Sequence, residues 1–197
     1  MKYPRKIYKH VIFNENNDYS LVEEIAGYLN FSGADTEYAF PSLKNIGGCL
    51  YCDESNTKDA FPKLKNIGGS LNCSGDNTKV TFPNLEIIGE YLHCDGADMK
   101  NAFPNLKTIG EYFNCTGSDT KDAFPKLKTI GGNLFFVGSY TGVTFPKLKT
   151  IGGDLYFDVE DAGVVFPSLE TVVGFLYFRG TDIKVASPKL KKQNEEH

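Results

Sequence analysis

The dipeptide Phe-Pro recurs at a constant interval of 21 residues, and this period constrains the fold more than any other feature of the chain. The repeated pattern is roughly F-P-x-L-K-x-I-G-G-x-L-x-C/F-x-G-x-D-T-K-x-A, numbered here as positions 1 to 21 of a turn. One such turn cannot bury its own apolar side chains, but turns stacked on one another can. The repeats begin at Phe40, Phe61, Phe82, Phe103, Phe124, Phe145 and Phe166.

Three positions of the turn are almost always aliphatic and form columns when turns are stacked. Position 4 is Leu from Leu43 to Leu190, position 7 is Ile or Val from Ile46 to Val172, and position 11 is Leu or Phe from Leu29 to Leu176. Paired strands lie ~4.8 Å apart, so eight turns predict a rod of about 38 Å. The columns predict a continuous core along that rod.

The pattern predicts short strands and corners in each turn. Positions 10 to 14 alternate outward and inward side chains, which is typical of a strand with one buried face. Positions 4 to 7 predict a second short extended segment, and the glycines predict corners. Sustained helical periodicity is absent from the sequence. We therefore expect an all-β, helix-poor protein, a single β-solenoid of about eight 21-residue turns, of the right-handed type and similar to a leucine-rich-repeat stack; the repeat itself does not determine the hand.

The frame divides the chain into one repeat domain with two caps. We predict an N-terminal cap over residues 1–18 and a solenoid over 19–186, with a C-terminal cap and polar tail over 187–197. The segment from Lys6 to Phe13 alternates enough to pair with the first turn. The turns are expected to start at residues 19, 40, 61, 82, 103, 124, 145 and 166.

The paired glycines at positions 8 and 9 resemble a phosphate-binding loop only superficially, because no strand-loop-helix context surrounds them. Ala26 and Val173 replace Gly at position 8, and Glu90 and Glu111 replace it at position 9. A positive φ is therefore not required there in every turn. We interpret these glycines as favouring a tight bend.

Cysteine occupies an inward position of the strand. Four of the five cysteines share position 13 with Phe, and residues that interchange with Phe in a stack indicate core packing. Stacked neighbours near 4.8 Å are too far apart for an ordinary disulfide. Cys49 lies on the opposite face from Cys52, so the Cys-x-x-Cys spacing does not predict a metal site. The expected core ladder is Phe31, Cys52, Cys73, Cys94, Cys115, Phe136, Phe157 and Phe178.

The sequence offers no catalytic constellation. His10, His93 and His197 are scattered, and nothing combines a nucleophile with a base and an orienting acid. The acidic stretch Asp158-Val-Glu160-Asp161 is interpreted as a solvated corner. We expect a protein that is not an enzyme and that needs no cofactor or metal.

The outward strand positions are rich in Tyr, Phe and Asn. Rigid aromatic residues beside small polar groups are typical of protein-binding faces. The alternative is that Tyr and Phe favour strands and stack only for stability. A contiguous exposed apolar patch in the last three turns favours binding. The candidate partner-binding residues are Tyr91, Tyr112, Phe135, Val137, Tyr156, Asp158, Phe175, Tyr177 and Arg179.

A second outward feature is a lysine ridge. It could follow a nucleic-acid backbone, but Glu86 and Glu170 interrupt it and Arg is missing from it. We interpret it as a solubilising ridge that deters lateral aggregation. Its members are Lys44, Lys63, Lys65, Lys107, Lys126, Lys128, Lys147 and Lys149, with Lys58, Lys79, Lys100 and Lys121 at a corner.

Segments such as FPKLKTIGGDLYF, beginning at Phe145, resemble the short leucine-rich-repeat-type solenoids of bacterial and phage proteins. They are also similar to the rungs of receptor L domains, in which Leu-x-x-Ile-Gly-Gly-x-Leu recurs. The resemblance covers about residues 19–190. It implies the architecture and a recognition surface, without implying a particular partner.

The bulk properties limit the function classes. The net charge of −4 gives no general attraction to nucleic acid or anionic membranes, and no apolar run fits a signal peptide or a membrane span. We expect a cytoplasmic module that binds and occludes another protein or protein complex. A narrower hypothesis is a phage- or mobile-element-encoded inhibitor of a bacterial defence nuclease complex. The alternatives are a surface adhesin or structural repeat protein, and nucleic-acid binding through the lysine ridge; the sequence does not determine the oligomeric state.

Overall fold

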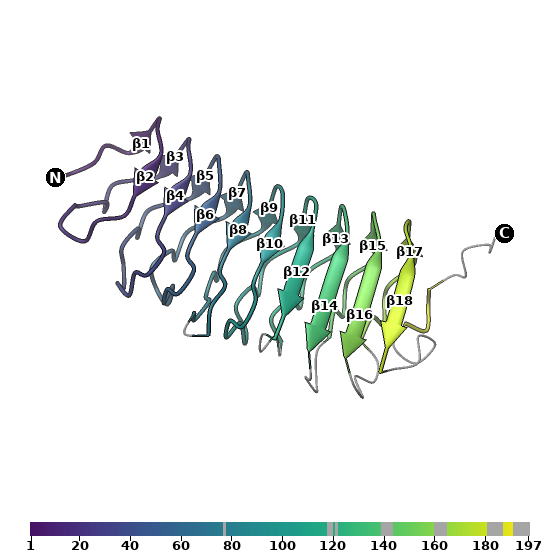
Figure 1. The fold of residues 1–197 in the computed structure, drawn as a ribbon. Coiled ribbons are helices and arrows are strands. Elements are labelled where there is room, and N and C mark those ends of the chain that lie inside the picture. Colours follow the sequence, from purple (N-terminus) through teal and green to yellow (C-terminus); the bar gives the residue numbers. More distant parts are fainter. Residues whose placement is uncertain are drawn as a thin grey trace.

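The computed structural model describes residues 1–76, 78–117, 120, 122–138, 144–159, 165–180 and 187–190. The turns follow one another in sequence order along a single axis, so that each turn contacts the turn before it and the turn after it (Figure 1). The secondary structure of these residues consists of strands, turns and bends, without a helix. The expected all-β solenoid of about eight 21-residue turns is confirmed.

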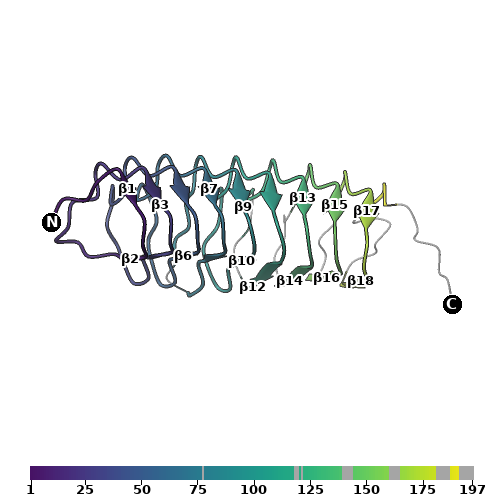
Figure 2. The same ribbon diagram turned by 90° about the horizontal axis from the view of Figure 1, so that it is seen from above.

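Two parallel sheets of nine strands run the length of the stack and face one another across the core (Figure 2). The odd-numbered sheet contains β1 (Lys6–Ile7), β3 (Glu24–Ile25), β5 (Asn45–Ile46), β7 (Asn66–Ile67), β9 (Ile87–Ile88), β11 (Thr108–Ile109), β13 (Thr129–Ile130), β15 (Thr150–Ile151) and β17 (Thr171–Val172). The even-numbered sheet contains β2 (Val11–Ile12), β4 (Leu29–Asn30), β6 (Leu50–Tyr51), β8 (Leu71–Asn72), β10 (Leu92–His93), β12 (Phe113–Thr116), β14 (Leu134–Gly138), β16 (Leu155–Val159) and β18 (Leu176–Arg179).

The pairing register follows the sequence repeat. Leu50 pairs with Leu71, and Leu134 pairs with Leu155, each 21 residues further on. A slip of one residue would turn the buried side chains outward, so the apolar columns hold this register. Most strands have only two residues, and their stability therefore comes from stacking and not from the single strand.

Residues 1–18 form a layer before the first repeat turn. Strand β1 pairs with β3 and places Ile7 against Ile25, while β2 pairs with β4 and places Val11 against Leu29. Ile7 and Val11 are buried like the equivalent residues of the repeat turns. These residues close the core at the N-terminal end.

The core is built from the columns at positions 1, 4, 7, 11 and 13. The rings at position 1 stack face to face; Phe103 and Phe124 have centroids 5.3 Å apart with 9° between the planes, and Phe145 and Phe166 are 5.2 Å apart at 7°. Such contacts add to the burial of each ring. In the last turn Leu176 is 37% exposed and Phe178 is half-buried, because the part of the chain that the structure describes has no further repeat turn over them.

The glycines at position 8 lie in bends, as expected from the sequence, and they also permit close packing between turns. None of them has a positive φ. A Cβ added at Gly110 would lie closer to the carbonyl oxygen of Gly89 than van der Waals radii allow. A Cβ added at Gly131 would clash with the carbonyl oxygen of Gly110 in the same way. Non-glycine residues occupy this column only near the ends of the stack, at Tyr8, Ala26 and Val173.

The backbone conformation at position 15 limits the length of the strand in the even-numbered sheet. Gly33, Gly75, Gly96, Gly117 and Gly180 have positive φ there, and so does Glu54 at 53°. In the sixth and seventh turns, Gly138 and Val159 occupy the same position as the last residues of five-residue strands. The even-numbered sheet is therefore most extensive in its last turns.

Candidate functional site

Three rings form a stack on the outer surface of the even-numbered sheet, a half-buried one between two exposed ones. Phe135 and Tyr156 have centroids 4.6 Å apart with 15° between their planes, and Tyr156 and Tyr177 are 4.3 Å apart at 3°. We call Phe135, Tyr156 and Tyr177 the aromatic ladder. It lies on β14, β16 and β18, toward the C-terminal end of the sheet in Figure 1.

The ladder follows directly from the register of the strands. Phe135 pairs with Tyr156 and Tyr156 pairs with Tyr177, so the three side chains leave the sheet at the same height. Their neighbours Leu134 and Phe136 point inward and are buried. Phe135 is 41% exposed and Tyr177 is 43% exposed, although both are large and partly apolar.

A hollow of about 290 Å³ lies beside the ladder. Its walls come from the outward side chains at positions 10 and 12, above the backbone of Leu134 and Leu155. Phe175, which is 86% exposed, stands at its C-terminal rim. The side chains lining it are Asn133, Phe135, Asp154, Tyr156, Phe175 and Tyr177.

Side-chain hydrogen bonds fix the position 10 wall. Asn133 Oδ1 accepts the backbone N–H of Asp154 at 2.8 Å, and Asp154 Oδ1 accepts the backbone N–H of Phe175 at 2.8 Å. Asn133 and Asp154 are not among the binding residues predicted from the sequence. Their signal is the recurrence of an amide or carboxylate at one position of consecutive turns, which lets each side chain reach the next backbone.

The other side of the ladder is polar. Asp158 and Arg179 form an ion pair of 3.5 Å, in which the Asp158 side chain is 19% exposed and that of Arg179 is 70% exposed. Burial, followed by the hydrogen bond with the Tyr177 hydroxyl, raises the pKa of Tyr156 above its ordinary value. The ladder therefore places its tyrosine hydroxyls beside a charged pair. Val137 lies half-buried in the same part of the sheet.

Tyr91 and Tyr112 are exposed on the same sheet, but their rings are further apart and less parallel than those of the ladder. Their centroids are 5.9 Å apart and their planes are tilted by 39°. They lie at position 10, and polar residues occupy position 12 of their turns, where His93 Nε2 lies 2.8 Å from Asp95 Oδ2. The predicted binding residues thus fall into a stacked group in the last turns and a looser tyrosine pair before it.

The position 13 cysteines lie in the core, together with the Phe residues of the same column. Cys52, Cys73, Cys94 and Cys115 are fully buried, between Phe31 and Phe136 in the stack. Burial, and secondarily the neighbouring thiols, raises the pKa of Cys52 and Cys94 well above the usual range. Cys49 is half-buried on the outer surface, where its Sγ accepts the backbone N–H of Ser70 at 3.4 Å.

Acidic residues of the same column interrupt the lysine ridge and pair with its lysines. Lys44 contacts Glu23 at 2.8 Å, Lys149 contacts Glu170 at 3.3 Å, and Lys107 pairs with Glu86. The hydrogen bond from Lys107 lowers the pKa of Glu86 below its ordinary value. The glutamates that interrupt the ridge in the sequence are therefore the ion-pair partners of its lysines. Lys121 lies outside the described residues.

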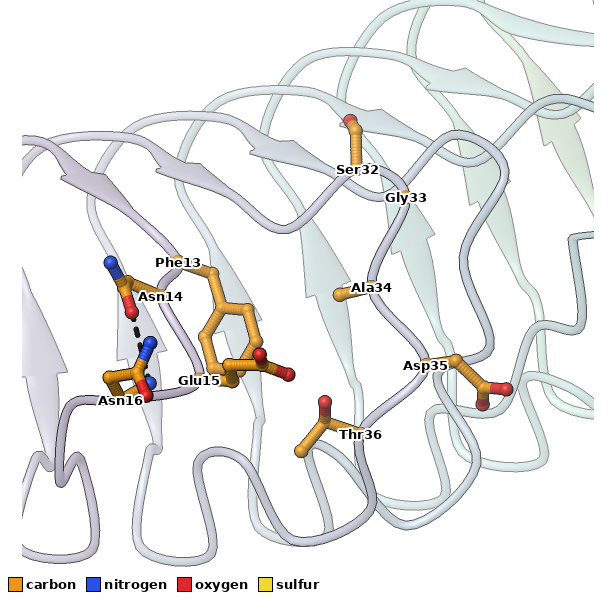
Figure 3. Close-up of a pocket in the computed structure, with 9 residues that line it drawn as sticks. All are labelled: Phe13, Asn14, Glu15, Asn16, Ser32, Gly33, Ala34, Asp35 and Thr36. Carbon is orange, nitrogen blue, oxygen red and sulfur yellow. Dashed lines mark hydrogen bonds between the residues drawn. The ribbon is translucent and has the colours of Figure 1, made fainter.

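A larger hollow of about 560 Å³ lies at the N-terminal corners of the stack (Figure 3). Phe13, Asn14 and Asn16 line one side of it, and Asn14 Oδ1 accepts the backbone N–H of Asn16 at 2.9 Å. Figure 3 shows the Asp35 carboxylate directed away from Glu15. The two carboxylates do not converge on a common point, and the lining gives no basis for a catalytic pair.

Within the ranges that the structure describes, no three His, Cys, Asp or Glu side chains lie close enough to hold a metal ion. The same ranges contain no helix of the length and apolar character needed to cross a bilayer. Comparisons with protein-family models, curated proteins and solved structures give no significant match.

Proposed function

We propose that this chain is a non-catalytic protein-recognition module that binds and occludes a partner protein through the aromatic ladder and the hollow beside it. The observation that carries the proposal is the stack of Phe135, Tyr156 and Tyr177 on the outer surface, bordered by the highly exposed Phe175. Large apolar side chains grouped on one surface of a folded domain are typical of interaction sites.

The rigidity of the surface supports this function. Each ring of the ladder is held by a paired strand and by its stacked neighbour, and the position 10 side chains are held by hydrogen bonds. Little conformational entropy is then lost when a partner binds, since the side chains are already ordered. Tyrosines also provide hydroxyls for hydrogen bonds at the rim of an interface.

The ring geometry favours a protein over a sugar or a nucleic-acid base. Sugars and bases stack on the open face of an aromatic ring. In the ladder the faces of Tyr156 cover those of Phe135 and Tyr177, at centroid distances of 4.6 and 4.3 Å. Both faces of Tyr156 are therefore covered, and its accessible edge and hydroxyl fit the side chains and backbone of a protein surface.

An affinity pull-down from lysate of the native host tests this function. The unaltered chain is compared with Phe135→Ser/Tyr156→Ser/Tyr177→Ser and with the control Tyr38→Ser/Ile87→Ser, which removes exposed apolar side chains elsewhere. We expect one stoichiometric partner that the control retains and the ladder variant loses, with all three chains folded by circular dichroism. A folded ladder variant that keeps every interaction would refute the proposed surface.

The narrower version is an inhibitor of a bacterial defence nuclease complex. It rests on the same surface and on the absence of a catalytic constellation in the sequence. It predicts that the captured partner is a subunit of such a complex and that adding the chain lowers nuclease activity in proportion to binding. An adhesin would instead appear in the envelope fraction of native cells, and nucleic-acid binding through the ridge would weaken steeply with salt.

A further inference from the structure

Among the described residues, the two ends of the even-numbered sheet, β2 and β18, carry open strand edges in the same register. The pairings place Val11 of β2 and Leu176 of β18 in one column, together with Ile12 and Tyr177 in the next. Unpaired strand edges are sites for the addition of a further strand. Here the strand that would continue β18 has the side-chain pattern of β2.

The hydrogen-bonding groups of the two edges are complementary. At positions 11 and 13, each backbone N–H donates to the next turn, as Leu29 does to Cys49 at 2.9 Å and Phe31 to Tyr51 at 2.7 Å. The same rule directs the N–H groups of Leu176 and Phe178 beyond the last turn. By the same pattern, the carbonyl groups of His10 and Ile12 point away from the first turn. The C-terminal edge therefore presents N–H donors, and the N-terminal edge presents carbonyl acceptors at the matching positions.

Apolar side chains are exposed at both edges. Ile12 is 71% exposed at one end and Tyr177 is 43% exposed at the other, and both lie at position 12. At position 10, His10 already stacks on Tyr28 with centroids 4.1 Å apart, and Phe175 has no ring above it among the described residues. Stacking one end on the other would cover these groups.

Charges at position 5 are complementary as well. Glu23 lies between Arg5, at 3.6 Å, and Lys44, at 2.8 Å. Glu170 in the last turn contacts Lys149 at 3.3 Å on one side, and its side chain remains 54% exposed. Arg5 of a second copy, stacked on the last turn, would complete the arrangement that surrounds Glu23.

Ser187–Leu190 obstructs this stacking. Ser187 Oγ donates to the carbonyl oxygen of Phe166 at 3.4 Å, and the Leu190 N–H donates to Ser187 at 3.2 Å as position 4 does to position 1 elsewhere. The segment thus occupies positions 1 to 4 of the next layer. In a second copy, Tyr3 fills position 1 of this layer, because its ring stacks on Tyr19 with centroids 4.8 Å apart.

We propose that the two ends are complementary surfaces for head-to-tail association of this chain with a second copy, and that Ser187–Leu190 holds this association in check. The contact repeats at each added copy, so its product is an open filament and not a closed dimer. The proposal shares Tyr177 and Phe175 with the aromatic ladder and its hollow, but the variants that test it leave every side chain of the ladder unchanged, so its failure and the failure of the proposed function can be told apart.

The test uses substitutions in the full chain that displace Ser187–Leu190 from the last turn. Ser187 is buried and Leu190 is partly buried, so Ser187→Asp/Leu190→Asp should expel the segment; Pro188→Asp/Lys189→Asp adds two carboxylates at exposed positions and is the matched control. We expect the first variant to form elongated oligomers by analytical ultracentrifugation and electron microscopy, while the control and the unaltered chain remain unassociated. Where circular dichroism shows that the double variant is unfolded, the milder Leu190→Asn takes its place.

Charge reversal then tests the register. On the unseated background, Arg5→Glu and Glu170→Lys should each weaken association at least tenfold, and the two together should restore it. A folded, unseated variant that does not associate would overturn the proposal. Association that is indifferent to both reversals would overturn the stacking register, and filaments of the unaltered chain would overturn the obstructing role of Ser187–Leu190.

Discussion

At the scale of single residues, backbone conformation and burial decide what each repeated position tolerates. Position 15 takes a left-handed conformation in several turns, and Gly occupies it in all but one of those described. Glu54 is the exception, with φ of 53°. A side chain with a Cβ pays a steric penalty in this region, whereas Gly does not.

Replacing Glu54 with Gly should therefore stabilise the protein by about 1 kcal/mol, through relief of left-handed strain. Chemical denaturation monitored by circular dichroism measures the change. The control is Glu54→Ala, which removes the carboxylate and keeps the Cβ, and it should leave stability nearly unchanged. Equal stabilisation by both substitutions would show that the carboxylate, and not φ, is responsible.

The five thiols should differ sharply in reactivity. Cys49 is partly accessible, whereas the position 13 thiols are fully buried and the pKa values of Cys52 and Cys94 are raised. Because the thiolate is the reactive species, we expect one fast-reacting thiol with Ellman's reagent and the other four only on unfolding. Cys49→Ser should abolish the fast phase; a fast phase that survives would contradict the inward position of the column.

At the scale of the elements, the strands depend on the distance between neighbouring turns. Strands of two residues cannot be stable alone, and they persist because backbone and side chains meet the next turn at a fixed spacing. The glycines at position 8 permit that spacing, since the carbonyl oxygen of one turn lies where a Cβ of the next would be. The resulting regularity aligns the rings of the aromatic ladder.

Gly110→Ala should destabilise the protein by about 2–3 kcal/mol, because the added methyl group forces neighbouring turns apart. The control is Glu111→Ala, one residue further on at an exposed position of the same corner, with an expected effect below about 0.5 kcal/mol. Thermal and urea unfolding of both variants measure the difference. Similar effects would indicate that position 8 is selected for its bend and not for close packing.

At the scale of the whole molecule, stability is shared between adjacent turns. An interior turn packs against two neighbours, while the last repeat turn packs against one and leaves Leu176 and Phe178 partly uncovered. The cost of losing a core side chain should then depend on its place along the stack. The same ends are where the solenoid can be extended.

Phe103→Ala in the interior should cost about 3–5 kcal/mol, and Phe178→Ala in the last turn about 1–2 kcal/mol, since a half-buried ring leaves a smaller cavity. Denaturant unfolding measures both costs, and amide hydrogen exchange should show faster opening in the last turn than around Phe103. Exposed Lys65→Ala serves as the control, with almost no effect. Equal costs for the two phenylalanines would contradict a nearest-neighbour stack.

The sequence by itself determined the solenoid, its 21-residue period and the inward columns, because a strict repeat of Phe, Leu and Ile can bury these side chains only by stacking. It also determined which face of the strand each aromatic residue occupies, since alternation within a strand is local. The exposed positions of Phe135 and Tyr177 follow from that alternation alone.

Only the tertiary structure decided the properties that arise between turns. The face-to-face stacking of Phe135, Tyr156 and Tyr177, the hydrogen bonds of Asn133 and Asp154, and the ion pairs of the lysine ridge all join residues about 21 apart. Side-chain orientation and the separation of the turns set these contacts, and neither is encoded in residue type. The role of the position 8 glycines became apparent for the same reason, because their constraint is the carbonyl oxygen of another turn.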